Sequence, residues 1–225
     1  MSDVRICLVG ASGLIGSQVI DAATGRSNIH LVAVARSELV LPKAARMEVL
    51  LGPTGQWGEL IAAAQAQVLV CALGTTMARA GSPEAFRAVD HDLVLDVARK
   101  ARSAGIAHLV LVSSIGASAM SRNFYLRVKG ETEVALRTLG FTRLDILQPG
   151  LLLGRRQEQR QLERLGQVVA PLAGALALHG KWRRFRAIRG ATVARTILAL
   201  SAEKAPGTFV HEYDALNRAA QRLGE

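Results

Sequence analysis

Two side chains that together can move a proton stand four residues apart in this sequence. Tyr125 and Lys129 fall in a stretch with helical patterning, so both project from one helix face. A free phenol has a pKa of about 10, and a nearby ammonium stabilises the phenolate. The pair could therefore act as general acid or base near neutral pH, although amphipathic surface helices also contain this spacing. Ser113 and Ser114 follow an apolar run, where a hydroxyl could meet a substrate oxygen or only hydrogen-bond at a strand end.

A glycine-rich turn follows the first apolar run. Glycines are needed where a backbone turns sharply, approaches a pyrophosphate, or packs tightly between strand and helix. Because this turn lies between a predicted strand and a predicted helix, it indicates a dinucleotide site, with phosphates facing the first helical N–H groups. The residues expected to contact the cofactor here are Gly10, Ser12, Gly13, Leu14, Ile15 and Gly16.

The second apolar run ends in Arg36 and Ser37, twenty residues beyond Gly16. An NAD enzyme usually has an acid there for the ribose 2′-hydroxyl, whereas an arginine suits a 2′-phosphate. The guanidinium could also stack on adenine, or simply be a solvated surface group. We therefore expect NADP(H) to be preferred, with NAD(H) as the alternative.

Short apolar runs alternate with amphipathic stretches along the chain, which predicts an α/β fold. The fold class expected is a Rossmann-type, doubly wound parallel sheet with helices on both faces and a small C-terminal substrate-side segment. The predicted strands are Val4–Val9, Ile29–Ala35, Met47–Leu51, Val68–Ala72, Leu109–Val112, Leu144–Leu147 and Thr208–His211, and a late helix is predicted over Thr192–Ala202.

The length of 225 residues predicts one domain, with a cofactor core over 1–150, a basic substrate-side segment over 151–190 and a closing helix-strand-helix unit over 191–225. The net charge is +10, and residues 151–190 hold nine basic but only two acidic side chains. This imbalance indicates an anionic substrate or an acidic protein partner. Arg155, Arg156 and Arg186 are the expected clamps for a phosphate or carboxylate.

Other partners are not expected from the sequence. Cys7 and Cys71 lie in apolar runs as inert core thiols, and the histidines have no ligand spacing, so no metal site is expected. Basic and aromatic residues interleave between Lys181 and Arg189, but snorkelling arginines explain this pattern better than nucleic-acid binding. No apolar stretch is long enough for a membrane span, and the N-terminus has no signal-peptide pattern, so a cytoplasmic location is expected.

These motifs resemble the short-chain dehydrogenase/reductase superfamily, in the atypical branch with a GxxGxxG loop. The resemblance extends to the branch that contains the Tat-interacting oxidoreductase and bacterial proteins described as nucleoside-diphosphate-sugar epimerases. It covers almost the whole chain, through the segments 71–76, 112–114, 123–131, 148–150 and 156–158.

The resemblance implies a role for each matching residue. Tyr125 would be the general acid or base, Lys129 its partner and a ligand of the nicotinamide ribose, and Ser114 the hydroxyl that orients a substrate carbonyl. Asp90 stands where many family members have a helical asparagine, and no acid follows the third strand to hold adenine. Further cofactor contacts are implied at Ala72, Leu73, Gly74, Thr75, Ser113, Pro149, Gly150 and Leu151.

The expected function is that of an NADP(H)-dependent oxidoreductase that transfers hydride to or from a small carbonyl or alcohol substrate. One alternative is an NADPH-binding regulatory protein with little turnover. Another is an enzyme like the sugar-nucleotide epimerases and dehydratases, although the segment after Gly150 is short for a sugar-nucleotide domain. Both a monomer and a homodimer fit the sequence.

Overall fold

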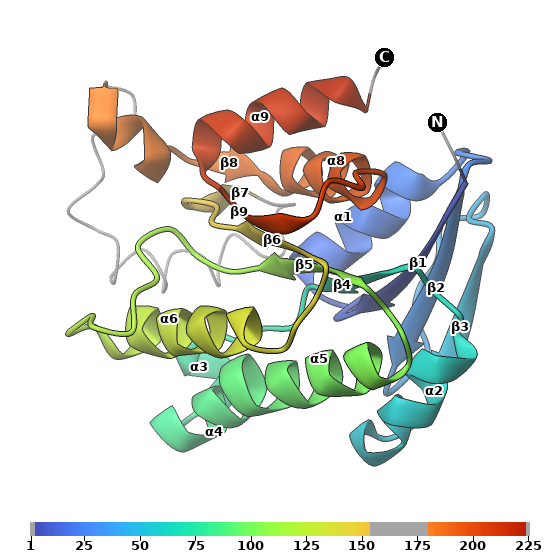
Figure 1. Ribbon diagram of the computed structural model, residues 1–225, viewed down its shortest axis with the longest axis horizontal. Helices are drawn as coiled ribbons and strands as arrows, with labels where there is room; N and C mark the ends of the chain where they lie inside the picture. The colour runs from blue at the N-terminus through green and yellow to red at the C-terminus, as the bar shows by residue number, and fades with distance from the viewer. Residues whose placement is uncertain (1–2, 154–179, 224–225) are drawn as a thin grey trace.

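A computed structural model describes residues 3–153 and 180–223. Within these residues, seven parallel strands form one sheet in the order β3-β2-β1-β4-β5-β6-β9 (Figure 1). A separate two-stranded ribbon pairs β7 with β8. The strands are β1 (Val4–Val9), β2 (Ile29–Ala35), β3 (Met47–Leu51), β4 (Val68–Cys71), β5 (His108–Val112), β6 (Arg143–Leu147), β7 (Leu152–Leu153), β8 (Ile188–Arg189) and β9 (Gly207–His211).

Helices connect the strands and cover both faces of the sheet. They are α1 (Leu14–Ala23), α2 (Trp57–Ala63), α3 (Met77–Ala80), α4 (Pro83–Arg87), α5 (Val94–Ser103), α6 (Phe124–Arg137), α8 (Gly190–Ser201) and α9 (Tyr213–Arg222). Short 3-10 turns occupy η1 (Thr54–Gln56) and η5 (Gly180–Phe185), and a π-helical turn, η2 (Ala88–Leu93), joins α4 to α5.

The predicted α/β fold class is confirmed. Continuous Val, Ile and Leu runs form the central strands because both faces of a parallel sheet are buried. The predicted bounds of β1, β2 and β3 agree with the structure, and those of the other main-sheet strands differ by one residue. The late helix begins at Gly190, two residues before the predicted start, and ends at Ser201.

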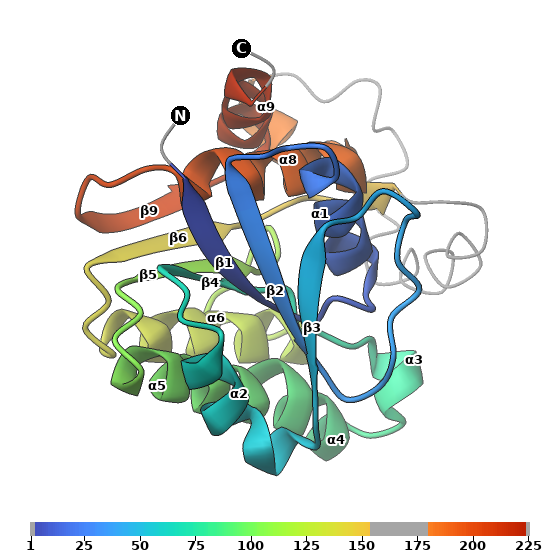
Figure 2. The ribbon, with the colours of Figure 1, turned by 90° about the vertical axis from the view of Figure 1, so that its right-hand side faces the viewer.

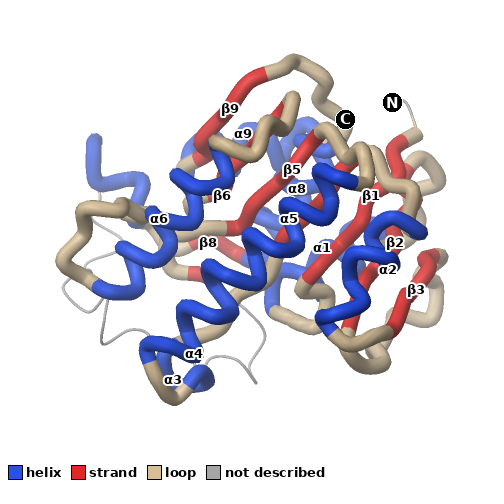
Figure 3. Tube along the Cα trace, turned by 60° about the horizontal axis from the view of Figure 1, so that its bottom comes forward, coloured by secondary structure: helices blue, strands red, loops and turns tan. Residues whose placement is uncertain are grey.

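Two apolar cores lie on opposite sides of the sheet. Helices α1, α8 and α9 cover one side, and α2, α5 and α6 cover the other (Figure 2). The second group lies in front of the strands in Figure 3. Trp57 begins α2 and is buried against this second core, as expected for a core anchor. None of the described helices is long and apolar enough to cross a bilayer.

The strand order places a switch point between β1 and β4. From β1 the chain proceeds outward to β2 and β3, and then returns to add β4, β5, β6 and β9 on the other side. In open α/β sheets, ligands bind beyond the carboxyl ends of the strands at such a point. The loops after β1, β4, β5 and β6 meet there, and they carry the residues that the sequence analysis selected.

A buried cluster of charged side chains links β9, the last strand, to its neighbours in the sheet. Asp145 on β6 is fully buried and accepts hydrogen bonds from His108 on β5 and His211 on β9, each at 2.7 Å, and from Arg143. Burial alone would raise the pKa of Asp145, but these hydrogen bonds and the arginine charge outweigh it and hold the pKa well below its usual range. The cluster links three neighbouring strands through one carboxylate.

Candidate functional site

The glycine turn packs tightly between β1, α1 and the end of β4. Gly10 has a φ of +86°, and a Cβ atom there would lie 2.5 Å from the carbonyl carbon of Ala72. A Cβ on Gly16 would lie 2.2 Å from the carbonyl oxygen of Gly10. Both positions therefore require glycine. The side chain of Ile15 is buried in the apolar core, so only the backbone of this residue can face a ligand.

The N-terminus of α1 is open to an anion. Gly13 is the N-cap and makes no side-chain cap, and the first turn of α1 contains no acidic residue. A Cβ on Gly13 would be 3.3 Å from the carbonyl oxygen of Gly10 and 4.0 Å from that of Ala72, with no other heavy atom within 4 Å. Ser12 is exposed beside it. A turn with free helical N–H groups and room for close backbone approach fits a dinucleotide pyrophosphate.

Helix α6 places Tyr125 and Lys129 at the same edge of the sheet as the glycine turn. Asn123 caps this helix by accepting a hydrogen bond from the Leu126 N–H at 3.2 Å. Gly130 allows the loop after β5 to approach, since a Cβ there would lie 2.1 Å from the carbonyl carbon of Ser118. The half-buried Tyr125 ring packs against Phe86, with 5.4 Å between ring centroids.

A continuous set of contacts connects the glycine turn to Lys129. The turn touches Ala72, and Gly74 follows two residues later along the loop after β4. A Cβ on Gly74 would lie 3.6 Å from Lys129 Nζ and 3.3 Å from Asp90 Oδ1. The predicted cofactor loop and the predicted proton-transfer pair are therefore neighbours in space.

Asp90 is a member of the site whose role the sequence analysis did not foresee. Its Oδ1 lies 2.7 Å from Lys129 Nζ, and its Oδ2 accepts a hydrogen bond from the Thr75 N–H at 2.8 Å. Burial by itself lowers the pKa of Lys129, but the negative charge of Asp90 and the electrostatic interaction with Tyr125 outweigh burial and raise it. The sequence signal was an acid on an otherwise apolar helix face that includes Phe86 and Leu93.

A second buried acid, Glu133, joins the ends of β5 and β6 and was also missed. It accepts hydrogen bonds from the Ser113 hydroxyl and from Gln148 Nε2, the latter at 2.9 and 3.0 Å. Burial raises the pKa of Glu133 despite these hydrogen bonds. Glu133 follows Lys129 by four residues on the same helix, a spacing that could have identified it.

The two serines of the predicted pair have different surroundings. Ser113 is buried and held by Glu133, whereas Ser114 is partly buried and its hydroxyl makes only a long 3.4 Å contact with the Ile115 carbonyl. Among the described residues, the Ser114 hydroxyl is therefore less engaged by hydrogen bonds than the Ser113 hydroxyl.

Gly150 lets a distant segment approach the end of β6. A Cβ on Gly150 would lie 2.4 Å from the carbonyl oxygen of Arg186, so the backbone after η5 lies against the Pro149–Leu151 loop. Ile188 donates a backbone hydrogen bond to Leu151 and is buried. Arg155 and Arg156, two of the three predicted clamps, lie outside the described residues.

The basic run near residue 185 is partly neutralised within the chain. Arg183 pairs with Asp214 at 2.9 Å, and Arg184 approaches Glu212 to 3.7 Å. Both acids lie at the start of α9. The expected excess charge is thus smaller here than the sequence suggested, because acids distant in sequence fold against these arginines. Trp182 is 60% exposed, and its ring lies against that of Phe185 with 5.8 Å between centroids.

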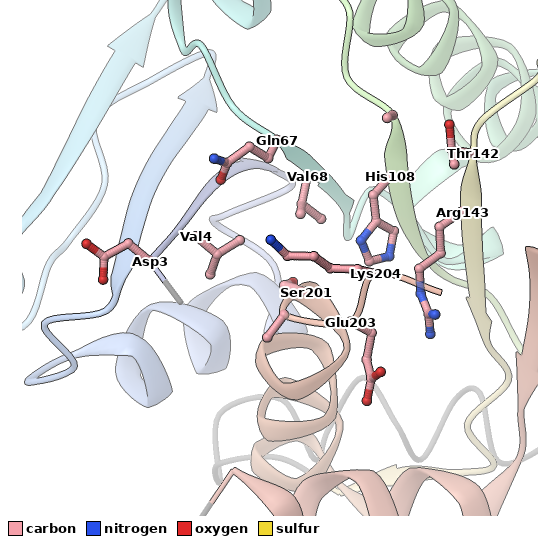
Figure 4. Close-up of a pocket in the computed structure, with 12 residues that line it drawn as sticks. Asp3, Val4, Gln67, Val68, His108, Thr142, Arg143, Ser201, Glu203 and Lys204 are labelled. Carbon is pink, nitrogen blue, oxygen red and sulfur yellow. The ribbon is translucent and has the colours of Figure 1, made fainter. Parts of the chain in front are cut away.

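A pocket of about 220 Å³ lies at the opposite edge of the sheet (Figure 4). Its lining includes Val4, Val68, His108 and Arg143, which begin β1, β4, β5 and β6, and Lys204 after α8. These are the amino ends of the strands, whereas the glycine turn and Tyr125 belong to the carboxyl ends. The pocket is therefore separate from the candidate site.

The part of the candidate site that the structure describes offers no readily ionised thiol and no metal cluster. Cys7 and Cys71 are buried, and burial raises the pKa of their thiols to about 12 and about 11. Residues 3–153 and 180–223 contain no group of three His, Cys, Asp or Glu side chains suited to a metal ion.

Fold and site together define a Rossmann-type protein of the short-chain dehydrogenase/reductase class. The family model for NAD(P)H-binding proteins matches residues 10–174, so the chain belongs to that family. The expected resemblance to atypical members of the superfamily is confirmed, and a nicotinamide dinucleotide is the cofactor class that this family binds.

Curated relatives cover almost the whole chain. This chain is 31% identical to mitochondrial protein fmp52 of Emericella nidulans, over 91% of its own length and 92% of the relative. It is 34% identical to mitochondrial FMP52 of Eremothecium gossypii, over 95% and 96%. The cytoplasmic location expected from the N-terminal sequence is contradicted by these relatives, whose names place them in mitochondria.

Solved structures share the fold at low sequence identity. A UDP-N-acetylglucosamine 4-epimerase from Methanobrevibacter ruminantium has a TM-score of 0.68 and 12% identity, over 98% of this chain and 81% of its own. The Bordetella bronchiseptica enzyme WbmG, solved with NAD and UDP, has a TM-score of 0.66 and 14% identity, over 99% and 79%. The family and fold support the expected class, an NAD(P)-dependent oxidoreductase-type enzyme.

Proposed function

We propose that this protein is an NADP(H)-dependent oxidoreductase that interconverts a carbonyl and an alcohol, with Tyr125 as the proton donor or acceptor. The observation that carries the proposal is the chain of contacts from Gly10 through Ala72 and Gly74 to Lys129. It supports the proposal because the glycine turn and the helix with Tyr125 and Lys129 lie at one edge of the sheet. A coincidental surface pair would have no reason to adjoin that turn.

The cofactor would lie along the carboxyl edge of the sheet. The turn from Gly10 to Gly16 would hold the pyrophosphate, and the loop from Ala72 to Thr75 would run beside the dinucleotide. Ser113 and the segment from Pro149 to Leu151 would border its nicotinamide end. The bound nicotinamide would supply or accept a hydride.

The side chains of the site would handle the proton. Tyr125 would donate a proton to the substrate oxygen during reduction and remove it during oxidation. Ser114 would donate a hydrogen bond to the same oxygen as negative charge develops on it. The buried ammonium of Lys129 would stabilise the phenolate that remains after donation.

The preference for NADP(H) rests on Arg36. This side chain is exposed directly after β2, the strand next to β1 in the sheet, and Ser37 beside it is also exposed. A guanidinium at this position can pair with a 2′-phosphate. It also takes the place of the acidic side chain that would select a free 2′-hydroxyl.

The substrate would enter beside Gly150, where the chain near Arg186 approaches the nicotinamide end. A small carbonyl compound with an anionic group fits this basic segment. Residues 1–150 would then act as the cofactor core and 151–190 as the substrate cover of a single domain.

Replacing Tyr125 with phenylalanine tests this mechanism. We expect Tyr125→Phe to lower turnover by about 10²–10⁴-fold, because the proton donor is lost, while NADPH binding is retained. Tyr213→Phe on α9 is the matched control and should keep full activity. Turnover would be followed by nicotinamide absorbance with a panel of ketones, aldehydes and UDP-sugars.

Each outcome of the panel assigns a function. NADPH oxidation by a carbonyl compound that requires Tyr125 supports the proposal, and full activity of Tyr125→Phe would contradict it. Isomerisation of a UDP-sugar without net NADPH oxidation would indicate epimerase chemistry. NADPH binding without any turnover would indicate a regulatory protein.

A further inference from the structure

The ion pair between Asp90 and Lys129 is unusual in its burial. The two side chains are 0% and 9% exposed, and Asp90 Oδ1 lies 2.7 Å from Lys129 Nζ. A buried charge without a partner strongly destabilises a folded protein. Apart from this ammonium, Oδ1 has no polar partner among the described residues. The carboxylate and the ammonium therefore depend on each other.

Two further hydrogen bonds hold Asp90 in place, one to its carboxylate and one to its main-chain carbonyl. Oδ2 accepts the Thr75 N–H at 2.8 Å, and the Thr132 hydroxyl donates to the Asp90 carbonyl oxygen at 3.0 Å. Asp90 also lies in the π-helical turn η2, a rare conformation that often marks functional sites. These contacts connect η2, α6 and the loop after β4 through one residue.

Four titratable groups face Lys129 from the surrounding elements. They are Asp90 on η2, Tyr125 and Glu133 on α6, and Cys71 on β4. Burial raises the pKa of Cys71 to about 11, which keeps that thiol neutral, and burial also raises the pKa of Glu133. Asp90 is thus the carboxylate in direct contact with the ammonium.

We propose that Asp90 is a positioning residue, the counter-ion that keeps Lys129 charged inside the protein and ties it to the Gly74–Thr75 loop. The link between that loop and the cofactor rests on the proposed function, whereas the counter-ion role does not. Without Asp90, burial would dominate and Lys129 would lose its proton at lower pH.

The same chain supplies a matched control. Asp96 and Lys100 on α5 also form an ion pair at 2.7 Å, but these side chains are 46% and 28% exposed. Because water screens an exposed pair, Asp96→Asn should change the titration of Lys100 little. Asp90→Asn also removes one carboxylate charge, but it does so in an ion pair that is buried away from water.

The experiment is a pH titration of lysine Nζ resonances by ¹H–¹⁵N NMR in the full chain without cofactor. We expect the Lys129 midpoint in Asp90→Asn to fall about 1–3 pH units below that of the wild type. The Lys100 midpoint in Asp96→Asn should stay near its wild-type value. An unchanged Lys129 midpoint in Asp90→Asn would overturn the counter-ion role. Since no turnover is measured, a failed oxidoreductase assay would not affect this result.

NADPH binding supplies a second measurement. The NADPH affinity of Asp90→Asn should fall about tenfold across the pH range in which the NMR titration shows Lys129 losing its proton, relative to wild type over the same range. Equal pH dependence in both proteins would show that Asp90 does not position Lys129 for the cofactor.

A double variant keeps the proposal testable if Asp90→Asn folds poorly. Replacing Asp90 with Asn and Lys129 with Gln removes both charges, so the double variant should have a higher Tm than Asp90→Asn alone. A double variant no more stable than the single one would contradict a counter-ion role.

Discussion

Arg36 is the single side chain on which cofactor choice depends in this account. It is exposed at the end of β2. A guanidinium bound to a phosphate contributes about 1.5–3 kcal/mol through charge-assisted hydrogen bonds. The 2′-phosphate is present in NADPH and absent from NADH, so the arginine should affect one cofactor and not the other.

We expect Arg36→Ala to weaken NADPH binding about 10–100-fold and to leave NADH binding unchanged. Fluorescence titration of both cofactors would measure this. Arg99→Ala, at an exposed position on α5, is the control and should bind both as the wild type does. Equal affinities of the wild type for the two cofactors would refute the preference.

Sequence reasoning identified the residues of the site that follow a local pattern. Tyr125 and Lys129 share one helix face, and this spacing is visible in the sequence. Asp90 lies about forty residues earlier, at a position that the resemblance had singled out. No local pattern, however, shows that a π-helical turn brings its carboxylate to Lys129 Nζ. Glu133 likewise accepts hydrogen bonds from Ser113 and Gln148 only because β5 and β6 lie side by side in the folded sheet.

At the scale of elements, the glycine turn is a tightly constrained connection between β1 and α1. Its fit depends on the lack of a side chain at Gly16, where the carbonyl oxygen of Gly10 would lie 2.2 Å from a Cβ atom. That oxygen belongs to backbone and cannot move without shifting β1 or α1. The geometry of the turn and the position of the helix therefore change together.

Gly16→Ala should destabilise the protein by about 1–3 kcal/mol and abolish NADPH binding, because the first turn of α1 is displaced from the end of β1. Gly55→Ala is the control, since a Cβ at Gly55 meets nothing within 4 Å. Thermal unfolding and cofactor titration measure the two effects. A Gly16→Ala variant with wild-type Tm and NADPH affinity would contradict the packing described for the turn.

The elements themselves were predictable because their signals are local. Continuous apolar runs defined β1 and β2, since a strand buried on both faces tolerates few polar residues. The edge strand β3 contains Glu48 and has no fully buried residue, yet its apolar residues still indicated a strand. The π-helical turn at Ala88–Leu93 was not predictable, because its sequence has the same periodicity as an α-helix. The pairing of Arg183 with Asp214 depends on how α9 folds back, which no local pattern encodes.

At the scale of the molecule, parallel strand order assembles the site from separate loops. The carboxyl ends of β1, β4, β5 and β6 all reach one edge of the sheet, and each contributes a different group. The pocket at the opposite edge has no glycine turn and no tyrosine-lysine pair. The chemistry proposed here therefore belongs to one edge only.

The most direct test of the account is a crystal structure of the wild-type protein with bound NADPH. We expect the pyrophosphate over the turn from Gly10 to Gly16 and the Tyr125 hydroxyl beside the nicotinamide ring. A cofactor bound elsewhere, or a Tyr125 hydroxyl directed away from that ring, would contradict it.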